Sequence, residues 1–159
     1  MTALDTLLSP GARLAPIMAA RGEILALTEA SGQAVLQPTD PGGLPAALRM
    51  ALALRAARTV GDAMLADHYR DRLALLPQAH CYAPFGDPRT RPKDPRLAAI
   101  VRHADRLARE PKSATKSDVA ALGEAGVADA DIVRLSELAA YLAYQARVVA
   151  GFRLLESTR

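Results

Sequence analysis

Residues 44–76 read LPAALRMALALRAARTVGDAMLADHYRDRLALL, and this stretch decides the fold class. It is rich in alanine and leucine, which favour helix over sheet. Gly61 interrupts it near the middle, so we expect two consecutive helices or one long helix that bends there. Across all 159 residues, 50% are hydrophobic but only 4% are aromatic. The sequence therefore predicts an all-α protein.

Turn-forming segments divide the chain into four parts of a single domain, because this length supports one core. Residues 1–43 are expected to form an N-terminal helical cap, and 44–76 the pair of helices described above. Five of the 11 prolines fall between residues 77 and 95, which predicts a long loop without regular structure over 77–94. Residues 95–159 are expected to form the C-terminal helices. We expect a bundle of six to seven helices.

The C-terminal part carries clear helix boundaries. The Asp94-Pro95 step is a strong helix start, and the helix that follows is expected to end before Pro111. A shorter helix then ends at Gly126. The final helix, over residues 130–156, is expected to be about 40 Å long at about 1.5 Å per residue.

Net charge is +3, but the 20 basic and 17 acidic residues are interspersed, which is typical of a solvated surface. The turn at Gly126 could belong to a DNA-binding helix-turn-helix. However, its second helix would turn Asp129 and Asp131 toward the phosphates. Only Arg134 and Arg147 would lie nearby. We therefore expect no nucleic-acid partner.

The single cysteine, Cys81, excludes an intrachain disulfide and a zinc site made of cysteines alone. The first residues, MTALDTLLSPGAR, lack a basic segment followed by a long apolar one. No run reaches about 18 uninterrupted apolar residues. These features predict a cytoplasmic protein that spans no membrane.

Histidine and cysteine supply the candidates for chemistry. His68 lies on a predicted helix with Asp71 at i+3, which fits either acid/base work or one structural hydrogen bond. His103 is expected to be structural or exposed. His80 and Cys81 could form a nucleophile or part of a metal site, but neighbours in an extended loop point in opposite directions. An incidental cysteine is therefore the preferred interpretation of Cys81.

Four short motifs follow one another between residues 97 and 155. They are a helix that ends in leucine and proline, a threonine-capped helix, a glycine turn, and a long helix with an aromatic, an arginine and a small residue. Their members are Leu107, Pro111, Thr115, Asp118, Val119, Leu122, Gly126, Asp129, Ile132, Tyr144, Arg147 and Gly151. The pattern resembles the C-terminal half of peroxidase-related proteins in the alkylhydroperoxidase D and carboxymuconolactone decarboxylase superfamily. Upstream, residues 48–70 look like the active-site helices of that superfamily.

The resemblance implies an alkylhydroperoxidase D-like fold without the family's thiol chemistry. In peroxidase members a CxxC motif precedes a histidine, which His68 matches. Gly61 and Met64 then stand where the cysteines would be, and a register shifted by one residue puts Asp62 and Leu65 there. Both thiols are absent, so we expect no cysteine-pair peroxidase activity.

The decarboxylase branch of the superfamily needs no cysteine pair. The resemblance therefore implies that His68, Arg55 and Arg147 could serve a small anionic substrate in a pocket near His68, and it implies no cofactor or metal. The alternative is a non-catalytic helical protein that partners a related enzyme of the superfamily. A polar, solvent-connected cavity would favour the enzyme, and apolar packing around His68 the interaction protein.

The last helix also predicts self-association. One face carries Ser136, Ala140, Ala143, Arg147 and Ala150. The opposite face carries Leu135, Leu138, Leu142, Val149 and Phe152, which can bury the helix against its own domain. The small residues are then left facing outward, so we expect a homo-oligomer.

Overall fold

The computed structural model describes residues 3–8 and 10–157. These residues form nine α-helices, two 3₁₀ helices and no strand, which confirms the all-α prediction. The α-helices are α1 (Ala3–Leu8), α2 (Leu14–Ala19), α3 (Gly22–Leu36), α4 (Ala46–Thr59), α5 (Ala63–Ala74), α6 (Ala79–Tyr82), α7 (Pro95–Arg109), α8 (Lys116–Glu124) and α9 (Asp129–Ser157), and the 3₁₀ helices are η1 (Ala83–Gly86) and η2 (Pro111–Ser113). The count exceeds the expected six to seven because α1 and α6 are too short for hydrophobic periodicity to reveal them.

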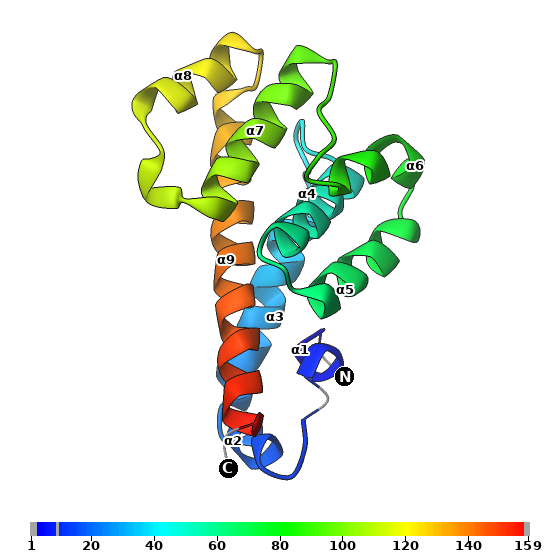
Figure 1. Cartoon of the computed structure of the whole chain (residues 1–159), viewed down its shortest axis with the longest axis vertical. Coiled ribbons are helices and arrows are strands. Elements are labelled where there is room, and N and C mark those ends of the chain that lie inside the picture. Colours follow the sequence, from blue (N-terminus) through cyan, green and yellow to red (C-terminus); the bar gives the residue numbers. More distant parts are fainter. Residues whose placement is uncertain (1–2, 9, 158–159) are drawn as a thin grey trace.

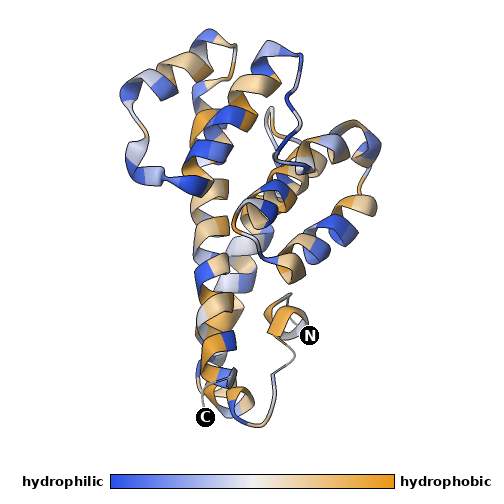
Figure 2. Cartoon of the chain, in the orientation of Figure 1, coloured by the Kyte–Doolittle hydropathy of each residue, from blue (hydrophilic) through white to orange (hydrophobic). Residues whose placement is uncertain are grey.

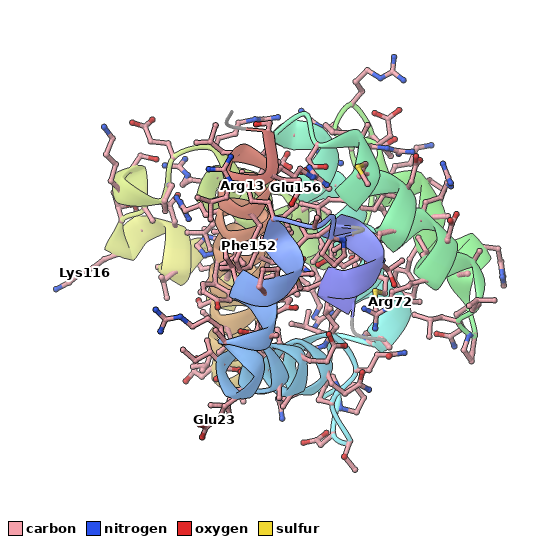
Figure 3. All side chains as sticks on the ribbon, turned by 90° about the horizontal axis from the view of Figure 1, so that it is seen from below. Arg13, Glu23, Arg72, Lys116, Phe152 and Glu156 are labelled. Atoms are coloured by element: carbon pink, nitrogen blue, oxygen red, sulfur yellow. The ribbon has the colours of Figure 1, made fainter. Side chains whose placement is uncertain are left out.

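The long helix α9 runs along the whole molecule (Figure 1). Helices α7 and α8 pack against its N-terminal half, and α1, α2 and α3 lie toward its C-terminal half. The backbone nitrogen of Leu14 donates to Oε2 of Glu156 at 2.9 Å, which fastens α2 to the end of α9. Figure 3 shows Glu156 and Phe152 beside α2. Within the described chain, none of the helices is long and apolar enough to cross a bilayer.

Helix α4 is the centre of the fold. It contacts α3, α5, α7 and α9, and ten of its fourteen residues are buried. A helix that is buried on every side must be apolar almost all round, and the alanines and leucines of α4 meet this condition. Figure 2 shows apolar residues along α4 and α9 and hydrophilic ones in the connecting segments. Buried side chains from α1 to α9 join one hydrophobic cluster.

Gly61 separates α4 from α5, as the sequence predicts. Its φ is +77°, which glycine adopts without steric cost. Asp62 then caps α5, because its side chain accepts a hydrogen bond from the nitrogen of Leu65 at 3.0 Å. The other carboxylate oxygen of Asp62 is 2.7 Å from Arg153 on α9. The turn is thus fixed to the long helix.

The proline-rich segment is more regular than the sequence predicts. Its residues form α6 and η1 between Ala79 and Gly86, so the expectation of an irregular loop over 77–94 is wrong for this part. Pro84 sits in the first turn of η1, where its missing N–H costs no hydrogen bond. Gly86 packs so closely on Leu54 that a Cβ there would lie 2.5 Å from the Leu54 side chain. Within 77–94, only residues 77–78 and 87–94 lack helix.

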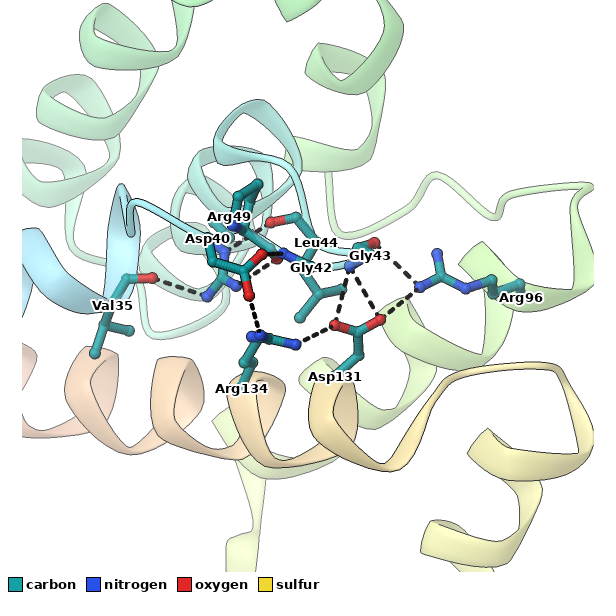
Figure 4. Close-up of polar contacts among 10 residues, drawn as sticks. Val35, Asp40, Gly42, Gly43, Leu44, Arg49, Arg96, Asp131 and Arg134 are labelled. Carbon is teal, nitrogen blue, oxygen red and sulfur yellow. Dashed lines mark hydrogen bonds and ion pairs between the residues drawn. The ribbon is translucent and has the colours of Figure 1, made fainter.

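A buried arginine holds the connection between α3 and α4 (Figure 4). Arg49 is only 2% exposed. Its guanidinium donates to the carbonyls of Leu44 at 2.7 Å, Val35 at 2.9 Å and Pro41 at 3.0 Å. The Val35 carbonyl lies in the last turn of α3 and the Leu44 carbonyl precedes α4, so both need a donor from outside the helix ladder, whereas the Pro41 carbonyl also accepts from the nitrogen of Leu44.

Asp131 fixes the same connection to the start of α9 (Figure 4). Both of its carboxylate oxygens accept from the nitrogen of Gly43. The carboxylate also pairs with Arg134 at 3.1 Å and Arg96 at 3.3 Å, and Arg134 reaches Asp40 at 2.8 Å. Arg134 and Asp131, which the helix-turn-helix hypothesis places at DNA, are therefore engaged inside the fold.

Candidate functional site

The four residues that the sequence singles out lie on four different helices. Arg55 is on α4, His68 on α5, Cys81 on α6 and Arg147 on α9. Within the described residues, none of them makes a hydrogen bond or ion pair with another. The fold therefore gives each of them a separate environment.

Arg55 is an internal anchor and is 1% exposed. Its Nε and Nη2 bind the carboxylate of Asp105 at 2.6 and 2.8 Å. The remaining donors go to main-chain carbonyls of η1 and of the segment that follows it, at Phe85, Asp87, Pro88 and Thr90. All five N–H groups of the guanidinium are thereby used. We assign Arg55 the role of holding this segment against α4 and α7, since no donor is left for a substrate.

His68 is half-buried and packs the edge of its ring against Tyr69, with ring centroids 5.3 Å apart. Its Nε2 is buried and has no hydrogen-bond partner among the described residues. Burial lowers the pKa of His68, and the positive charge of Arg72 lowers it further. His68 is therefore neutral at pH 7 and able to accept a proton. It lines none of the three cavities described around α4 and α7.

The positions opposite the missing cysteines lie at the first turn of α5. Asp62 is the cap of this helix, and Leu65 is buried in the core. Met64 is 49% exposed. These side chains have structural or surface positions, and none of them supplies a nucleophile.

Cys81 and His80 are both exposed on α6. Sγ of Cys81 lies 3.3 Å from Nε2 of His80. The expectation that the two side chains point in opposite directions is wrong, because the segment is helical rather than extended. In the part of the chain that the structure describes, no group of three or more histidine, cysteine or acidic side chains could hold a metal.

Arg147 is exposed and donates to the carbonyl of Ala143 at 3.1 Å, one turn earlier on α9. Ser136, Ala140 and Ala150 are exposed beside it, while Ala143 is half-buried. The predicted small-residue face thus looks outward for most of its length. The homo-oligomer stays a prediction.

A cleft of about 440 Å³ runs along another face of α7, and the sequence analysis missed it. The segment before α7 contributes Arg91 and Pro92, and the η2 region contributes Glu110 and Ser113. From α7 itself come residues at helical spacing, namely Ala98, Val101, Arg102, Asp105, Arg106 and Arg109. In Figure 2 the C-terminal end of α7 and η2 form a hydrophilic region.

Positive charge exceeds negative charge in this arginine cleft. Of its two carboxylates, Asp105 is bound by Arg55, and Glu110 lies 3.6 Å from Lys112. Among the described residues, Arg102 and Arg109 make no hydrogen bond or ion pair. Both are exposed on the wall of the cleft.

The other two arginines of the cleft have internal partners. Arg91 donates to the carbonyl of Pro88 at 2.6 Å. Arg106 lies 3.4 Å from Asp118 on α8 and donates to the carbonyl of Ser113 at 3.3 Å. These contacts hold the guanidinium groups of Arg91 and Arg106 in the lining of the cleft, which also carries Arg102 and Arg109. The arrangement can bind an anion through charge-assisted hydrogen bonds.

The arginine cleft depends on the Arg55 anchor. Asp105 belongs both to the anchor and to the lining of the cleft. The carbonyls that Arg55 holds lie immediately before Arg91 and Pro92, which form one wall. The resemblance implies that Arg55 contacts an anion, whereas the geometry has it shape a cleft that other arginines line.

Comparison with known proteins yields no relative: no family model, no curated protein and no solved structure matches this chain. The resemblance to the carboxymuconolactone decarboxylase superfamily therefore stays a prediction.

Proposed function

We propose that this protein binds a small anionic molecule, a carboxylate or a phosphate ester, in the arginine cleft on α7. The observation that carries this proposal is the pair of unpartnered arginines, Arg102 and Arg109, in a cleft whose carboxylates already have partners. The volume of about 440 Å³ falls in the range of small-molecule sites, roughly 300–1,000 Å³.

The chemistry of guanidinium supports an anion with oxygen atoms. Arginine presents a planar fork of donors that matches carboxylate and phosphate groups. Arg102 and Arg109 are seven positions apart, about two helical turns, and so stand on the same side of α7. A ligand with two acidic groups could engage both. The proposal keeps the small anionic ligand that the family resemblance implies and changes its location.

A second candidate is the acid/base role that the resemblance implies for His68. It is favoured by the buried Nε2, which has no hydrogen-bond partner in the described chain, and by a lowered pKa that keeps the ring neutral. Apolar packing around His68 would instead support the interaction protein. A His68→Gln variant separates these roles from the proposed one, since it should leave anion binding in the arginine cleft unchanged.

Calorimetric titration with citrate and with inorganic phosphate at low ionic strength tests the proposal. Wild type should bind at least one of them saturably. Arg102→Ala and Arg109→Ala should each weaken binding about tenfold or more, because each removes a charge-assisted hydrogen bond. Arg147→Ala is the matched control, since it removes an exposed arginine from another helix.

Three outcomes would overturn the proposal. The first is wild-type protein that binds neither anion. The second is an equal loss of affinity in Arg147→Ala, which would indicate general charge attraction. The third is saturable binding of duplex DNA that Arg102→Ala and Arg109→Ala abolish, since this would assign the cleft to a nucleic-acid backbone.

A further inference from the structure

A second cavity lies on the opposite side of α7 from the arginine cleft. It has a volume of about 50 Å³, is partly open to solvent, and is lined by residues of α4, α5, α7 and α9 and by Val60. Helix α7 contributes Ala104 and Ala108, each placed between the arginines of the cleft in sequence. Since successive helix positions turn by about 100°, these alanines face away from Arg102 and Arg106.

Small side chains account for the space. Eight of the sixteen lining residues are alanines, which come from three of the helices. They are Ala53, Ala56 and Ala57 on α4, Ala104 and Ala108 on α7, and Ala139, Ala143 and Ala146 on α9. Protein interiors have few voids larger than a water molecule, and one water needs about 10–15 Å³ on this scale. This cavity therefore has room for a small organic molecule.

One polar position interrupts the apolar lining. The hydroxyl of Tyr69 donates to Oε1 of Gln145, and these two side chains are 1% and 2% exposed. Within the described chain, the side-chain nitrogen of Gln145 donates no hydrogen bond. Burial raises the pKa of Tyr69 above its ordinary value, so the hydroxyl keeps its proton. The cavity thus offers one free donor and no charge.

Water is a poor occupant of this cavity. A buried water makes about three hydrogen bonds to protein, whereas the lining residues provide polar side-chain groups only from Tyr69 and Gln145. A charged ligand is excluded for the same reason, because no lining residue carries an opposite charge.

We propose that this alanine cavity binds a small, uncharged, mainly apolar molecule with a single hydrogen-bond acceptor, which the amide of Gln145 recognises. The ligand class is that of a short ketone or ether. The site is separate from the arginine cleft, so the two proposals can fail independently.

Cyclopentanone and cyclopentane serve as matched probes, since only the ketone carries an acceptor. Titration followed by ¹H–¹⁵N NMR should show saturable shifts for cyclopentanone around Tyr69 and Gln145. Cyclopentane should bind about two- to tenfold more weakly, which is the effect of one hydrogen bond.

Filling the cavity provides the structural test. Ala143→Leu should weaken cyclopentanone binding at least tenfold, because the added atoms occupy the site. Ala140→Leu is the matched control on the exposed face of α9 and should bind as wild type does. Ala139→Leu fills the cavity from another position and serves if Ala143→Leu fails to fold. Citrate and phosphate titrations of the same variants should be unchanged.

Absence of saturable shifts near the cavity in wild type would overturn this proposal. Equal loss in Ala140→Leu and Ala143→Leu would also overturn it. So would a fall in mass by light scattering in Ala143→Leu that parallels its loss of binding, because it would identify the surface as a contact between copies of the chain.

Discussion

Arg49 and Arg55 lie fewer than two turns apart on α4 and are buried to the same extent, yet only Arg55 has a carboxylate partner. Both gather main-chain carbonyls from a connecting segment. Arg49 binds three carbonyls around residues 35–44, and Arg55 binds four between residues 85 and 90. One helix therefore uses the same chemistry to hold two segments that lack regular structure.

The difference lies in how the buried charge is balanced. Desolvation lowers the pKa of Arg49, and the nearby charge of Arg134 adds to this effect. Asp131, the nearest buried carboxylate, is bound by Gly43, Arg96 and Arg134 instead. Arg49 thus relies on peptide dipoles, whereas Arg55 relies on an opposite charge. Loss of the two arginines should consequently have unequal costs.

Arg55→Met should produce the largest destabilisation. It leaves Asp105 buried without its partner and the carbonyl of Phe85 without a donor, whereas the other three carbonyls keep a donor from Thr90 or Arg91. Removal of one member of a buried ion pair costs about 3–5 kcal/mol. Urea unfolding followed by circular dichroism measures this cost. Arg58→Met is the control on the same helix, because Arg58 is exposed and makes a single bond to Gly86 at 3.0 Å. Similar midpoints for the two variants would contradict the prediction.

Arg49→Met should cost less, about 1–3 kcal/mol, because it leaves unpaired carbonyls but no unpaired buried charge. The same unfolding experiment applies. A cost equal to that of Arg55→Met would show that peptide dipoles balance the Arg49 charge as well as a carboxylate balances the Arg55 charge. This result would contradict the expected difference between the two arginines.

Local pattern was enough to predict much of the fold. Gly61, the Asp94-Pro95 step and Gly126 are boundary signals that act on adjacent residues, and the structure has a helix end or start at each. The short helix α6 and the 3₁₀ helix η1 were not predictable in this way. Tertiary packing, such as that of Gly86 on Leu54, stabilises them against the local tendency of proline to interrupt helices.

The candidate site was harder to predict, because its parts come from distant positions. Arg55 and Asp105 are fifty positions apart, so the sequence could not indicate that the charge of Arg55 was already balanced. The spacing of Arg102, Arg106 and Arg109 on one helix face was a visible signal. The spacing alone could not indicate a cleft, because Arg91 joins the lining from the irregular segment before α7, whose path the sequence does not predict.

Replacement of the whole Arg55–Asp105 pair sharpens the comparison. The double variant Arg55→Met with Asp105→Leu removes the buried charge that Arg55→Met alone would leave. Apolar replacements of buried ion pairs are often nearly neutral. The double variant should therefore be about 1–2 kcal/mol more stable than Arg55→Met, although the carbonyl of Phe85 still lacks a donor. If the double variant is instead less stable than Arg55→Met, the lost hydrogen bonds to main-chain carbonyls, rather than the unpaired charge of Asp105, account for most of the destabilisation.

Acidification should have the smallest effect and should act on the Arg55 side alone. His103 lies on α7 two positions before Asp105, and it lines a small cavity with Asp118, Arg106 and Arg102. Burial lowers its pKa from 6.5, so the unfolded chain takes up a proton at a higher pH than the folded one. The stability that the neutral His103 ring contributes is present above pH 6.5, and it is lost as the pH falls through the lower pKa of His103 in the folded state. Hydrogen exchange should quicken first in α7 and α8, while residues 35–44, which contain no histidine, keep their protection.

His103→Gln should flatten the pH dependence of hydrogen exchange in α7 and α8. His68→Gln removes another histidine of lowered pKa, on α5, and is the control that should leave hydrogen exchange in α7 unaffected. Equal loss of protection at both anchors would contradict the assignment to His103.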